Sequence, residues 1–358
     1  MLVANVCHTY YPHIGGVETH VEEISTRLVK RGLQVEVLTT DPSGRLPTEE
    51  TLNGVKVRRF KSWAPNEAYY FSQGLRKYLM KKSSEYDVIH AHGYHSFPAL
   101  FAAEAKGRNK LVFTPHYHGS GHTLFRSLLH RPYKFLGKKI FKRADKIICV
   151  SNYEKGLVFK HFKIEEEKTV VIPNGIKLDE FKSVKKRSKD YKIALYVGRL
   201  EKYKGVHHLI RAMPKLDGDI FLEIVGNGPY REPLTKLSRS LGLESRVRFF
   251  QDLSRDELLQ KYADSDVFVL LSEREAFGIT VAEALASGIP CVLANTSALT
   301  EWIDNQNCFG VNYPIELDEL VRVVVGTIGR DVNPTKLWDC EEVAEKIAEL
   351  YFNVKGTR

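Results

Sequence analysis

Residues 267–290 constrain the fold of this chain more than any other segment. The apolar run Val267–Leu271 is typical of a buried strand, and residues 279–287 resemble a helix that Gly288 and Pro290 terminate. The intervening loop therefore ends at a helix N-terminus. At this position an α/β sheet binds anionic ligands through backbone N–H groups.

Two glutamates flank this helix start. Glu275 precedes the helix and Glu283 lies eight residues later, within it, while Ala276, Phe277 and Gly278 offer backbone N–H groups. Carboxylates beside an anion site fit a ligand with both hydroxyls and phosphates, such as a nucleotide sugar, because a carboxylate accepts two hydrogen bonds from a vicinal diol. A solvated acidic helix start is the simpler alternative.

Length and composition predict two ordinary domains. The chain has 358 residues, of which 43% are hydrophobic. No stretch approaches the ~18 apolar residues of a membrane span, and residues 1–6 resemble a first strand and not a signal peptide. The five cysteines are scattered without a Cys-x-x-Cys pair, which favours a reducing cytoplasm and argues against disulfides and a structural zinc site.

The net charge of +9 is concentrated in the first half. Residues 1–165 hold 26 Lys/Arg and 14 Asp/Glu, whereas the remainder holds 27 and 30. Between Glu104 and Asp145 there are ten basic residues and no acidic one. The segment is either a solvated face whose apolar side chains pack into the core, or a surface for an anionic membrane or acceptor. Its larger apolar residues include Phe125, Leu128, Leu129, Phe135 and Phe141.

Short apolar strands alternate with helices along the whole chain, which is typical of doubly wound parallel sheets. In residues 1–175 we expect strands at 2–7, 34–39, 55–60, 88–91, 111–114 and 146–150, and helices at 17–31, 74–82 and 97–106. In residues 193–334 we expect strands at 193–197, 221–225, 247–249, 267–271 and 291–294, and helices at 206–213, 234–241, 257–263 and 279–287. The polar, basic residues 176–192 are expected to link the two domains, and residues 335–358 contain a last helix.

A basic loop follows the strand at 193–197. Arg199 and Lys204 place two cations in one loop at the carboxyl end of a strand, where they suit a diphosphate. Lys202 is expected to be solvated, and an ordinary exposed basic loop is the alternative.

Further motifs follow other strands. Gly15 and Gly16 open the first helix, although they do not form a dinucleotide fingerprint. His92 and His116 end neighbouring strands, and His116 and His118 have a spacing that resembles a metal motif but lack a nearby carboxylate. Asn174 belongs to an Asn-Gly turn, and Gly226 opens a Gly-Asn-Gly-Pro loop.

These motifs resemble the retaining GT-B glycosyltransferases, specifically glycosyltransferase family 4. The resemblance implies a GT-B fold of two Rossmann-like domains facing across a cleft, with the last helix crossing back onto the first domain. It implies that Glu283 binds the ribose, that Glu275 and His116 face the donor sugar, and that Arg199 and Lys204 bind the diphosphate. Further substrate contacts are implied for Gly15, Gly16, His92, Asn174, Gly226, Asp252, Leu253, Ala276, Phe277 and Gly278.

The chain departs from the family pattern near the sugar. Ala276 stands where Gly is usual, residues 295–301 lack glycines often found there, and residues 305–308 replace a common Asp-Gly turn. These departures leave the identity of the sugar open.

The resemblance predicts a metal-independent enzyme without a cofactor. It would transfer a hexose-type sugar, with retention, from a UDP-, GDP- or ADP-sugar to a hydroxyl of a sugar, lipid-linked or phosphorylated acceptor. It would act in the cytoplasm, with the inner membrane face as a candidate location. The alternatives are a GT-B phosphorylase, a sugar-nucleotide epimerase and a nucleic-acid-binding protein. Nucleic acid is not an expected partner, because no base-stacking module is visible.

Overall fold

The computed structural model describes residues 1–13, 15–119, 136–333 and 335–356. It contains two compact units, the first formed by residues 1–175 with 338–358 and the second by residues 176–337. Both are α/β units built on largely parallel sheets. None of the helices in the described residues combines the length and hydropathy that a membrane span requires.

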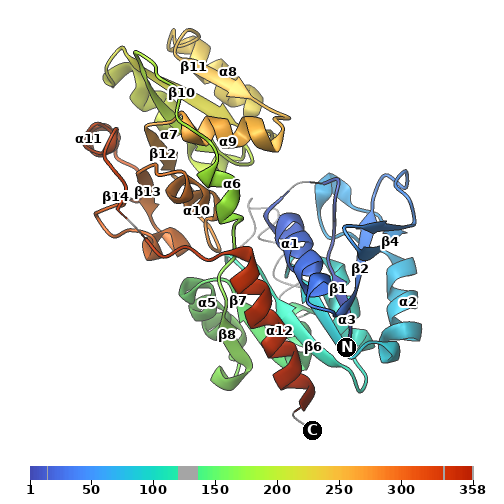
Figure 1. Ribbon diagram of the computed structural model, residues 1–358. Helices are drawn as coiled ribbons and strands as arrows, with labels where there is room; N and C mark the ends of the chain where they lie inside the picture. The colour runs from blue at the N-terminus through green and yellow to red at the C-terminus, as the bar shows by residue number, and fades with distance from the viewer. Residues whose placement is uncertain (14, 120–135, 334, 357–358) are drawn as a thin grey trace. The chain divides into compact units, whose positions relative to one another are not determined.

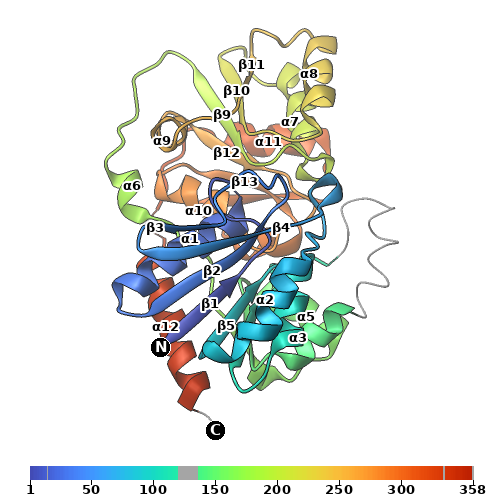
Figure 2. The same cartoon turned by 90° about the vertical axis from the view of Figure 1, so that its right-hand side faces the viewer.

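The first unit contains an eight-stranded sheet with the order β3-β4-β2-β1-β5-β6-β7-β8. Every neighbouring pair is parallel except β3 with β4. The strand order changes direction between β1 and β5, and Figure 2 shows β1 lying between β2 and β5. The strands are β1 Leu2–Val6, β2 Gln34–Asp41, β3 Glu49–Leu52, β4 Val55–Lys61, β5 Val88–His92, β6 Lys110–Thr114, β7 Lys146–Cys149 and β8 Thr169–Val171.

Helices cover both faces of this sheet because its strands are apolar on both sides. One face packs against α1 (Gly16–Lys30) and α12 (Cys340–Gly356), which lie side by side (Figure 1). The other packs against α2 (Gln73–Lys82), α3 (Phe97–Ala105) and α5 (Asn152–Phe162). The last helix therefore belongs to the first unit, although the whole second unit precedes it in the chain.

The second unit contains a six-stranded parallel sheet with the order β11-β10-β9-β12-β13-β14. This order is that of a dinucleotide-binding Rossmann fold, and its switch point lies between β9 and β12. The strands are β9 Lys192–Val197, β10 Ile220–Val225, β11 Val247–Phe250, β12 Val267–Leu270, β13 Cys291–Asn295 and β14 Cys308–Asn312.

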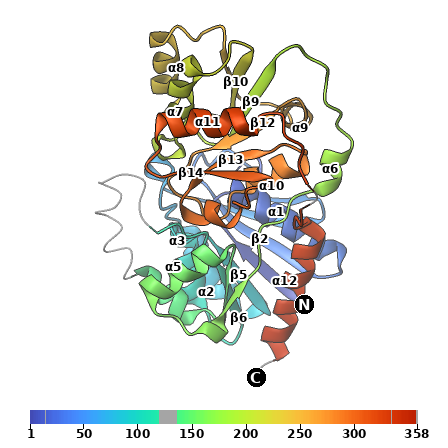
Figure 3. The same ribbon diagram turned by 90° about the vertical axis from the view of Figure 1, so that its left-hand side faces the viewer.

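Two groups of helices enclose this second sheet around one apolar core. Helix α7 (Val206–Ala212) contacts α8 (Arg231–Ser240) and α11 (Leu317–Thr327), and Figure 3 shows α11 lying beside α7. Helix α6 (Leu178–Lys182) contacts α9 (Arg255–Ala263) and α10 (Ile279–Ala286).

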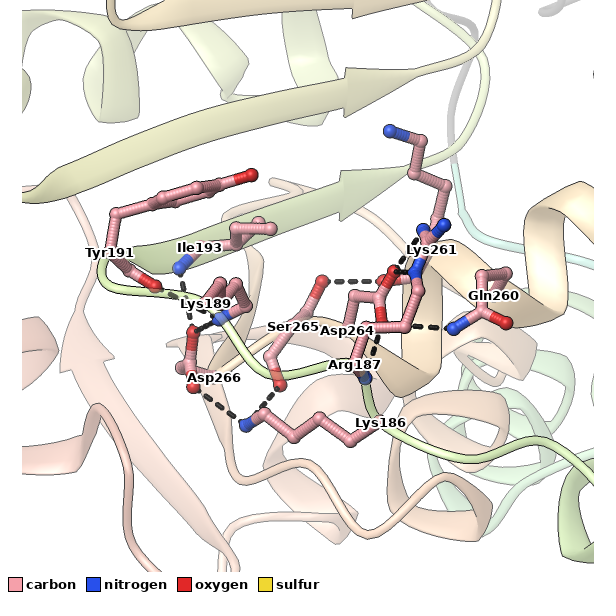
Figure 4. Close-up of polar contacts among 10 residues, drawn as sticks. All are labelled: Lys186, Arg187, Lys189, Tyr191, Ile193, Gln260, Lys261, Asp264, Ser265 and Asp266. Carbon is pink, nitrogen blue, oxygen red and sulfur yellow. Dashed lines mark hydrogen bonds and ion pairs between the residues drawn. The ribbon is translucent and has the colours of Figure 1, made fainter.

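Residues 176–192, expected as a linker, are part of the second unit. The Lys186 Nζ atom lies 2.6 Å from Asp266 Oδ1, and Arg187 Nε donates to Asp264 Oδ2 at 2.8 Å (Figure 4). Lys189 also pairs with Asp266. Burial opposes the charge of Asp266, but the hydrogen bonds from Lys186 and Lys189 lower its pKa. The basic residues of this segment thus attach it to the end of α9 and the start of β12.

Candidate active site

Two loops of the second unit meet at the switch point of its sheet. One follows β9 and carries Arg199 and Lys204, and the other follows β12 and carries Glu275. The backbone N–H of Glu273 donates to the carbonyl oxygen of Tyr203 at 2.8 Å. In open α/β sheets this position outside the carboxyl ends of the strands is where ligands bind.

Lys204 and Glu275 form an ion pair between the two loops. Lys204 Nζ lies 2.6 Å from Glu275 Oε1, and the side chains are 16% and 15% exposed. Burial opposes the charge of Lys204, but Glu275 and the neighbouring Tyr203 and Tyr196 raise its pKa. The ammonium group is therefore held protonated beside a carboxylate.

Arg199 is the more accessible cation of the first loop. Its side chain is 54% exposed, and its Nε lies 3.2 Å from Glu201 Oε1. Its backbone carbonyl accepts a hydrogen bond from the Tyr196 hydroxyl at 3.0 Å. This carbonyl anchors the loop, and Lys202 in the same loop is exposed as expected.

Gly226 permits a close approach between two loops of this sheet edge. Its φ is 141°, and a Cβ built on it would lie 2.0 Å from the carbonyl oxygen of Gly198. No other residue fits this contact, so Gly226 keeps the loop after β10 against the loop after β9.

Glu283 is oriented by two residues that the sequence interpretation did not identify. Arg255 Nη1 donates to Glu283 Oε1 at 2.8 Å, and the Tyr262 hydroxyl donates to Oε2 at 2.9 Å. Burial, with the charge of Glu283, raises the pKa of Tyr262. A carboxylate has about four acceptor positions, so Glu283 can still accept from a diol. Arg255 and Tyr262 lie seven residues apart on one face of α9, but this spacing alone does not link them to Glu283.

The segment from Glu275 to Gly278 is supported by residues that follow β13. The N–H of Glu275 donates to Ser297 Oγ at 3.1 Å, and Trp302 Nε1 donates to the carbonyl of Phe277 at 2.7 Å. Ala276 lies between these two anchored positions, and Gly278 directly precedes α10. Ser297 belongs to the segment where the sequence departs from the family pattern, so this departure contacts Glu275 directly.

Three other predicted residues are Asp252 and Leu253 of the second unit and Asn174 of the first. Asp252 is exposed after β11 with a φ of 54°, and Leu253 packs on the core of the second unit. Asn174 belongs to the first unit and is buried, with an Oδ1 that has no hydrogen-bond partner among the described residues.

In the first unit, Gly15 precedes α1 and Gly16 begins it. Glu18 lies in the first turn of α1, with its Oε1 atom 3.2 Å from His8 Nε2. Burial opposes the charge of Glu18, but the hydrogen bonds from His8 and Thr9 lower its pKa to about 2. The start of α1 therefore already carries a fixed negative charge.

His92 and His116 lie together with His20, a residue that the sequence interpretation missed. The ring centroid of His20 lies 5.9 Å from that of His92 and 5.5 Å from that of His116. The spacing of His116 and His118 suggested a different pair, but His118 is not in the cluster. His20 gives no sequence signal because it lies in the middle of an amphipathic helix.

His90 serves the core and not the ligand site. Its Nδ1 lies 2.6 Å from the Tyr351 hydroxyl of α12, and its Nε2 lies 2.7 Å from Thr114 Oγ1. Burial, with the charge of His116, lowers the pKa of His90 to about 3. The imidazole therefore links β5, β6 and α12 in its neutral form.

The two halves of the chain match two family models. Residues 14–180 match "Glycosyltransferase Family 4" and residues 178–322 match "Glycosyl transferases group 1". An uncharacterized glycosyltransferase of Methanocaldococcus jannaschii is 29% identical, with 98% of each chain covered. The phosphatidylinositol N-acetylglucosaminyltransferase GPI3 subunit of Saccharomyces cerevisiae is 24% identical over 99% of this chain and 83% of the yeast protein.

A solved structure shares the fold over almost the whole chain. It is the Anabaena protein HepE in complex with UDP and glucose, which is 20% identical and has a TM-score of 0.80, covering 99% of this chain and 100% of HepE. The two parallel-sheet domains and these matches define a transferase, a glycosyltransferase with the GT-B fold. Within that class the chain belongs to the family 4-like glycosyltransferases.

Proposed function

We propose that this enzyme is a retaining, metal-independent glycosyltransferase that moves a hexose from a nucleoside-diphosphate sugar to a hydroxyl acceptor. The observation that carries this proposal is the Lys204–Glu275 pair at the switch point of the second sheet. A cation and a carboxylate, side by side at a ligand-binding sheet edge, match a ligand with a charged diphosphate next to a polyhydroxyl sugar.

The donor would bind to the second unit. Arg199 and Lys204 would stabilise the charge that develops on the leaving diphosphate, as an oxyanion hole does. Glu283, held by Arg255 and Tyr262, would accept hydrogen bonds from the ribose hydroxyls. Gly226 and the Asp252–Leu253 loop would border the nucleoside, and the UDP bound by the Anabaena protein supports a uridine donor.

The proposed chemistry needs no enzyme nucleophile. The bond between the anomeric carbon and the diphosphate oxygen breaks, and the acceptor oxygen bonds to the same face of that carbon. The proton of the acceptor hydroxyl passes to the leaving phosphate oxygen. Glu275, with the backbone of Ala276, Phe277 and Gly278, would orient the sugar for this transfer.

Residues of the first unit would complete the sugar and acceptor side. His116, with His92 behind it, would contact the donor sugar in its neutral form, because burial and the charge of His8 lower the pKa of His116 to about 4. Gly15 and Gly16 would allow close approach of the ligand. Since Glu18 already places a carboxylate beside them, a sugar hydroxyl is favoured there over a phosphate. Asn174 would contribute an unpaired buried acceptor.

We propose a phosphorylated or lipid-linked acceptor, met in the cytoplasm at the inner face of the membrane. The yeast relative's name, which includes phosphatidylinositol, and the basic first half of the chain support this. Phe125, Leu128, Leu129 and Phe135 lie outside the described residues. In residues 136–144, which are described, Phe141 is buried while Lys138 and Lys139 are exposed. This part of the acid-free segment therefore fits the interpretation in which apolar side chains pack into the core and basic ones face solvent.

A donor screen tests the reaction. The chain would be incubated with UDP-, GDP- and ADP-hexoses, with and without inositol phosphate acceptors, in the presence of EDTA, and the anomeric configuration of the product read by NMR. Retention, with transfer that requires acceptor and survives EDTA, is expected. Release of sugar phosphate with inorganic phosphate would indicate a phosphorylase, and donor isomerisation without acceptor an epimerase. Loss of turnover that Mg²⁺ or Mn²⁺ restores would refute metal independence.

Binding to vesicles tests the membrane proposal. Co-sedimentation with anionic vesicles at low salt should weaken as salt rises, since the Debye length falls to about 3 Å at 1 M. Protein that stays in the supernatant with these vesicles would indicate a water-soluble acceptor.

A further inference from the structure

Three histidines of the first unit converge from three different elements. His20 lies on α1, His92 ends β5, and His116 follows β6. Strands β5 and β6 are parallel neighbours, and His92 lies opposite Thr114 in their register. One ring nitrogen from each histidine lies within 4.8 Å of the others. The topology of the sheet thus brings together residues that are far apart in the sequence.

Four ring nitrogens of this cluster have no hydrogen-bond partner within the described part of the chain. This holds for Nε2 of His20, for both nitrogens of His92 and for Nε2 of His116. His20 is 5% exposed and His92 is fully buried. Buried polar atoms are normally hydrogen-bonded, so a cluster of histidines that holds four unpaired nitrogens indicates a missing ligand.

The electrostatic state of the cluster suits a cation. Burial, together with the neighbouring histidines, lowers the pKa of His20 and of His92. The rings are therefore neutral at pH 7 and present lone pairs. Glu18 adds a nearby negative charge that acts on His116. Neutral imidazoles bind divalent transition metals, and three of them with one open position form a frequent zinc coordination.

We propose that His20, His92 and His116 form a site for one divalent transition-metal ion of the zinc, cobalt and copper group. Zinc–nitrogen bonds of about 2.0–2.1 Å would bring the ligand nitrogens to roughly 3.3 Å of one another, so metal binding must draw them closer than their present separation of up to 4.8 Å. The partly exposed His116 gives the ion access from solvent. The site would be inhibitory and not catalytic, because a bound ion would occupy the nitrogen of His116.

Metal titration of the full chain tests the site directly. After treatment with a chelator and its removal, Co²⁺ should bind once per chain and give the intense visible absorption of four-coordinate cobalt, and Zn²⁺ should displace it. His20→Gln should weaken Co²⁺ binding at least ten-fold. The double variant His207→Gln/His208→Gln, which removes an adjacent histidine pair in the second unit, should bind as the wild type does.

Long-range ¹H–¹⁵N spectra of the wild-type imidazoles provide a measurement that needs no variant. Zn²⁺ should shift one nitrogen in each of three rings. Unshifted rings, or a His20→Gln variant that binds Co²⁺ with wild-type affinity, would overturn the proposal. A further readout rests on the proposed function: Zn²⁺ should inhibit wild-type turnover and inhibit His20→Gln at least ten-fold less. If the chain has no transferase activity, the cobalt spectrum and the ring shifts still decide the metal site.

Discussion

Lys204 and Glu275 come from loops after two different strands, yet their charged atoms lie 2.6 Å apart. The cation proposed for the diphosphate and the carboxylate proposed for the sugar are therefore paired with each other in the absence of ligand. An arriving diphosphate must compete with Glu275 for Lys204, which would couple donor binding to the position of the carboxylate. Arg199, by contrast, is mostly exposed and lies beside Glu201.

Arg199→Ala should lower kcat by about 10²–10³-fold, because it removes a charge-matched donor from the developing diphosphate charge. The free energy of unfolding should change by less than about 0.5 kcal/mol, since the side chain is mostly exposed. Steady-state kinetics at saturating donor measure the effect, and Lys202→Ala in the same loop is the control. Equal turnover in the two variants would remove Arg199 from the mechanism.

Lys204→Met should destabilise the fold as well as slow turnover, because it leaves Glu275 without its partner. Breaking a fully buried pair costs about 3–5 kcal/mol, and the partial exposure of both side chains predicts roughly 1–3 kcal/mol here. The double variant Lys204→Met/Glu275→Gln should recover part of this loss. Urea unfolding of the two single variants and the double variant gives the coupling, and strictly additive losses would contradict a stabilising ion pair.

Glu283→Gln should mainly weaken nucleotide binding, by roughly 1–1.5 kcal/mol, because a charge-assisted hydrogen bond becomes a neutral one. Glu275→Gln should act more on turnover, since that carboxylate is assigned to the sugar. Calorimetric titration with free UDP separates the two roles. The glutamine keeps an acceptor for the buried Tyr262 hydroxyl, which an alanine would leave unpaired. An equal loss of UDP affinity in both variants would refute the division.

The first unit should lose stability in mild acid. Burial lowers the pKa of His20, His90, His92 and His116, so these rings take up protons only on unfolding. Stability is then full above pH about 6.5 and falls as the pH drops toward the lowered values, by about 1.4 kcal/mol per pH unit for each ring. Urea unfolding between pH 7.5 and 5 measures the slope. His20→Gln should reduce this slope by the contribution of one ring, and an unchanged slope would show that the pKa of His20 is not lowered in the folded protein.

Gly175→Ala should destabilise the protein by about 1–3 kcal/mol through overpacking. A Cβ at Gly175 would lie 2.7–2.9 Å from backbone atoms of Asp339 and Cys340, at the start of α12. Gly156, within α5, has no atom near its Cβ position, so Gly156→Ala should stabilise by about 0.5–1 kcal/mol. Thermal unfolding of the two variants checks the contrast. If Gly175→Ala matches the wild type, the start of α12 can move away without loss.

The repeated strand–helix pattern was sufficient to predict the class of fold, because strands buried on both faces are strongly apolar. The strands β3 and β8 were missed: they are short and partly exposed, so they lack that signal. Strand β14 was missed because Gly310 interrupts its apolar residues. Helix α5 was missed because it contains Gly156 and has little amphipathic pattern. Its one local signal is the N-cap residue Ser151, whose Oγ accepts a hydrogen bond from the N–H of Glu154.

The candidate site was partly predictable, because some of its residues form local motifs and others depend on tertiary contacts. Glycines, cations and carboxylates in βα loops can be recognised from the sequence, because these residue types at the carboxyl end of a strand are typical of ligand-binding sites. Arg255 and Tyr262 hold Glu283, and His20 completes the histidine cluster. All three lie on helices, where a polar side chain usually faces solvent and has no functional role. Their importance comes from tertiary contacts across 20 or more residues, and local pattern does not encode such contacts.

The order in which a ribosome produces this chain has a consequence for its first unit. Residues 176–337 must be synthesised before α12 emerges, a delay on the order of 10–30 s at about 5–20 residues per second. During that time the sheet face that Val343, Ile347 and Tyr351 later cover has no α12 to shield it. The nascent enzyme therefore presents an apolar surface to the cell until α12 is made, and termination before α12 would leave that surface permanently available for aggregation or for chaperone capture.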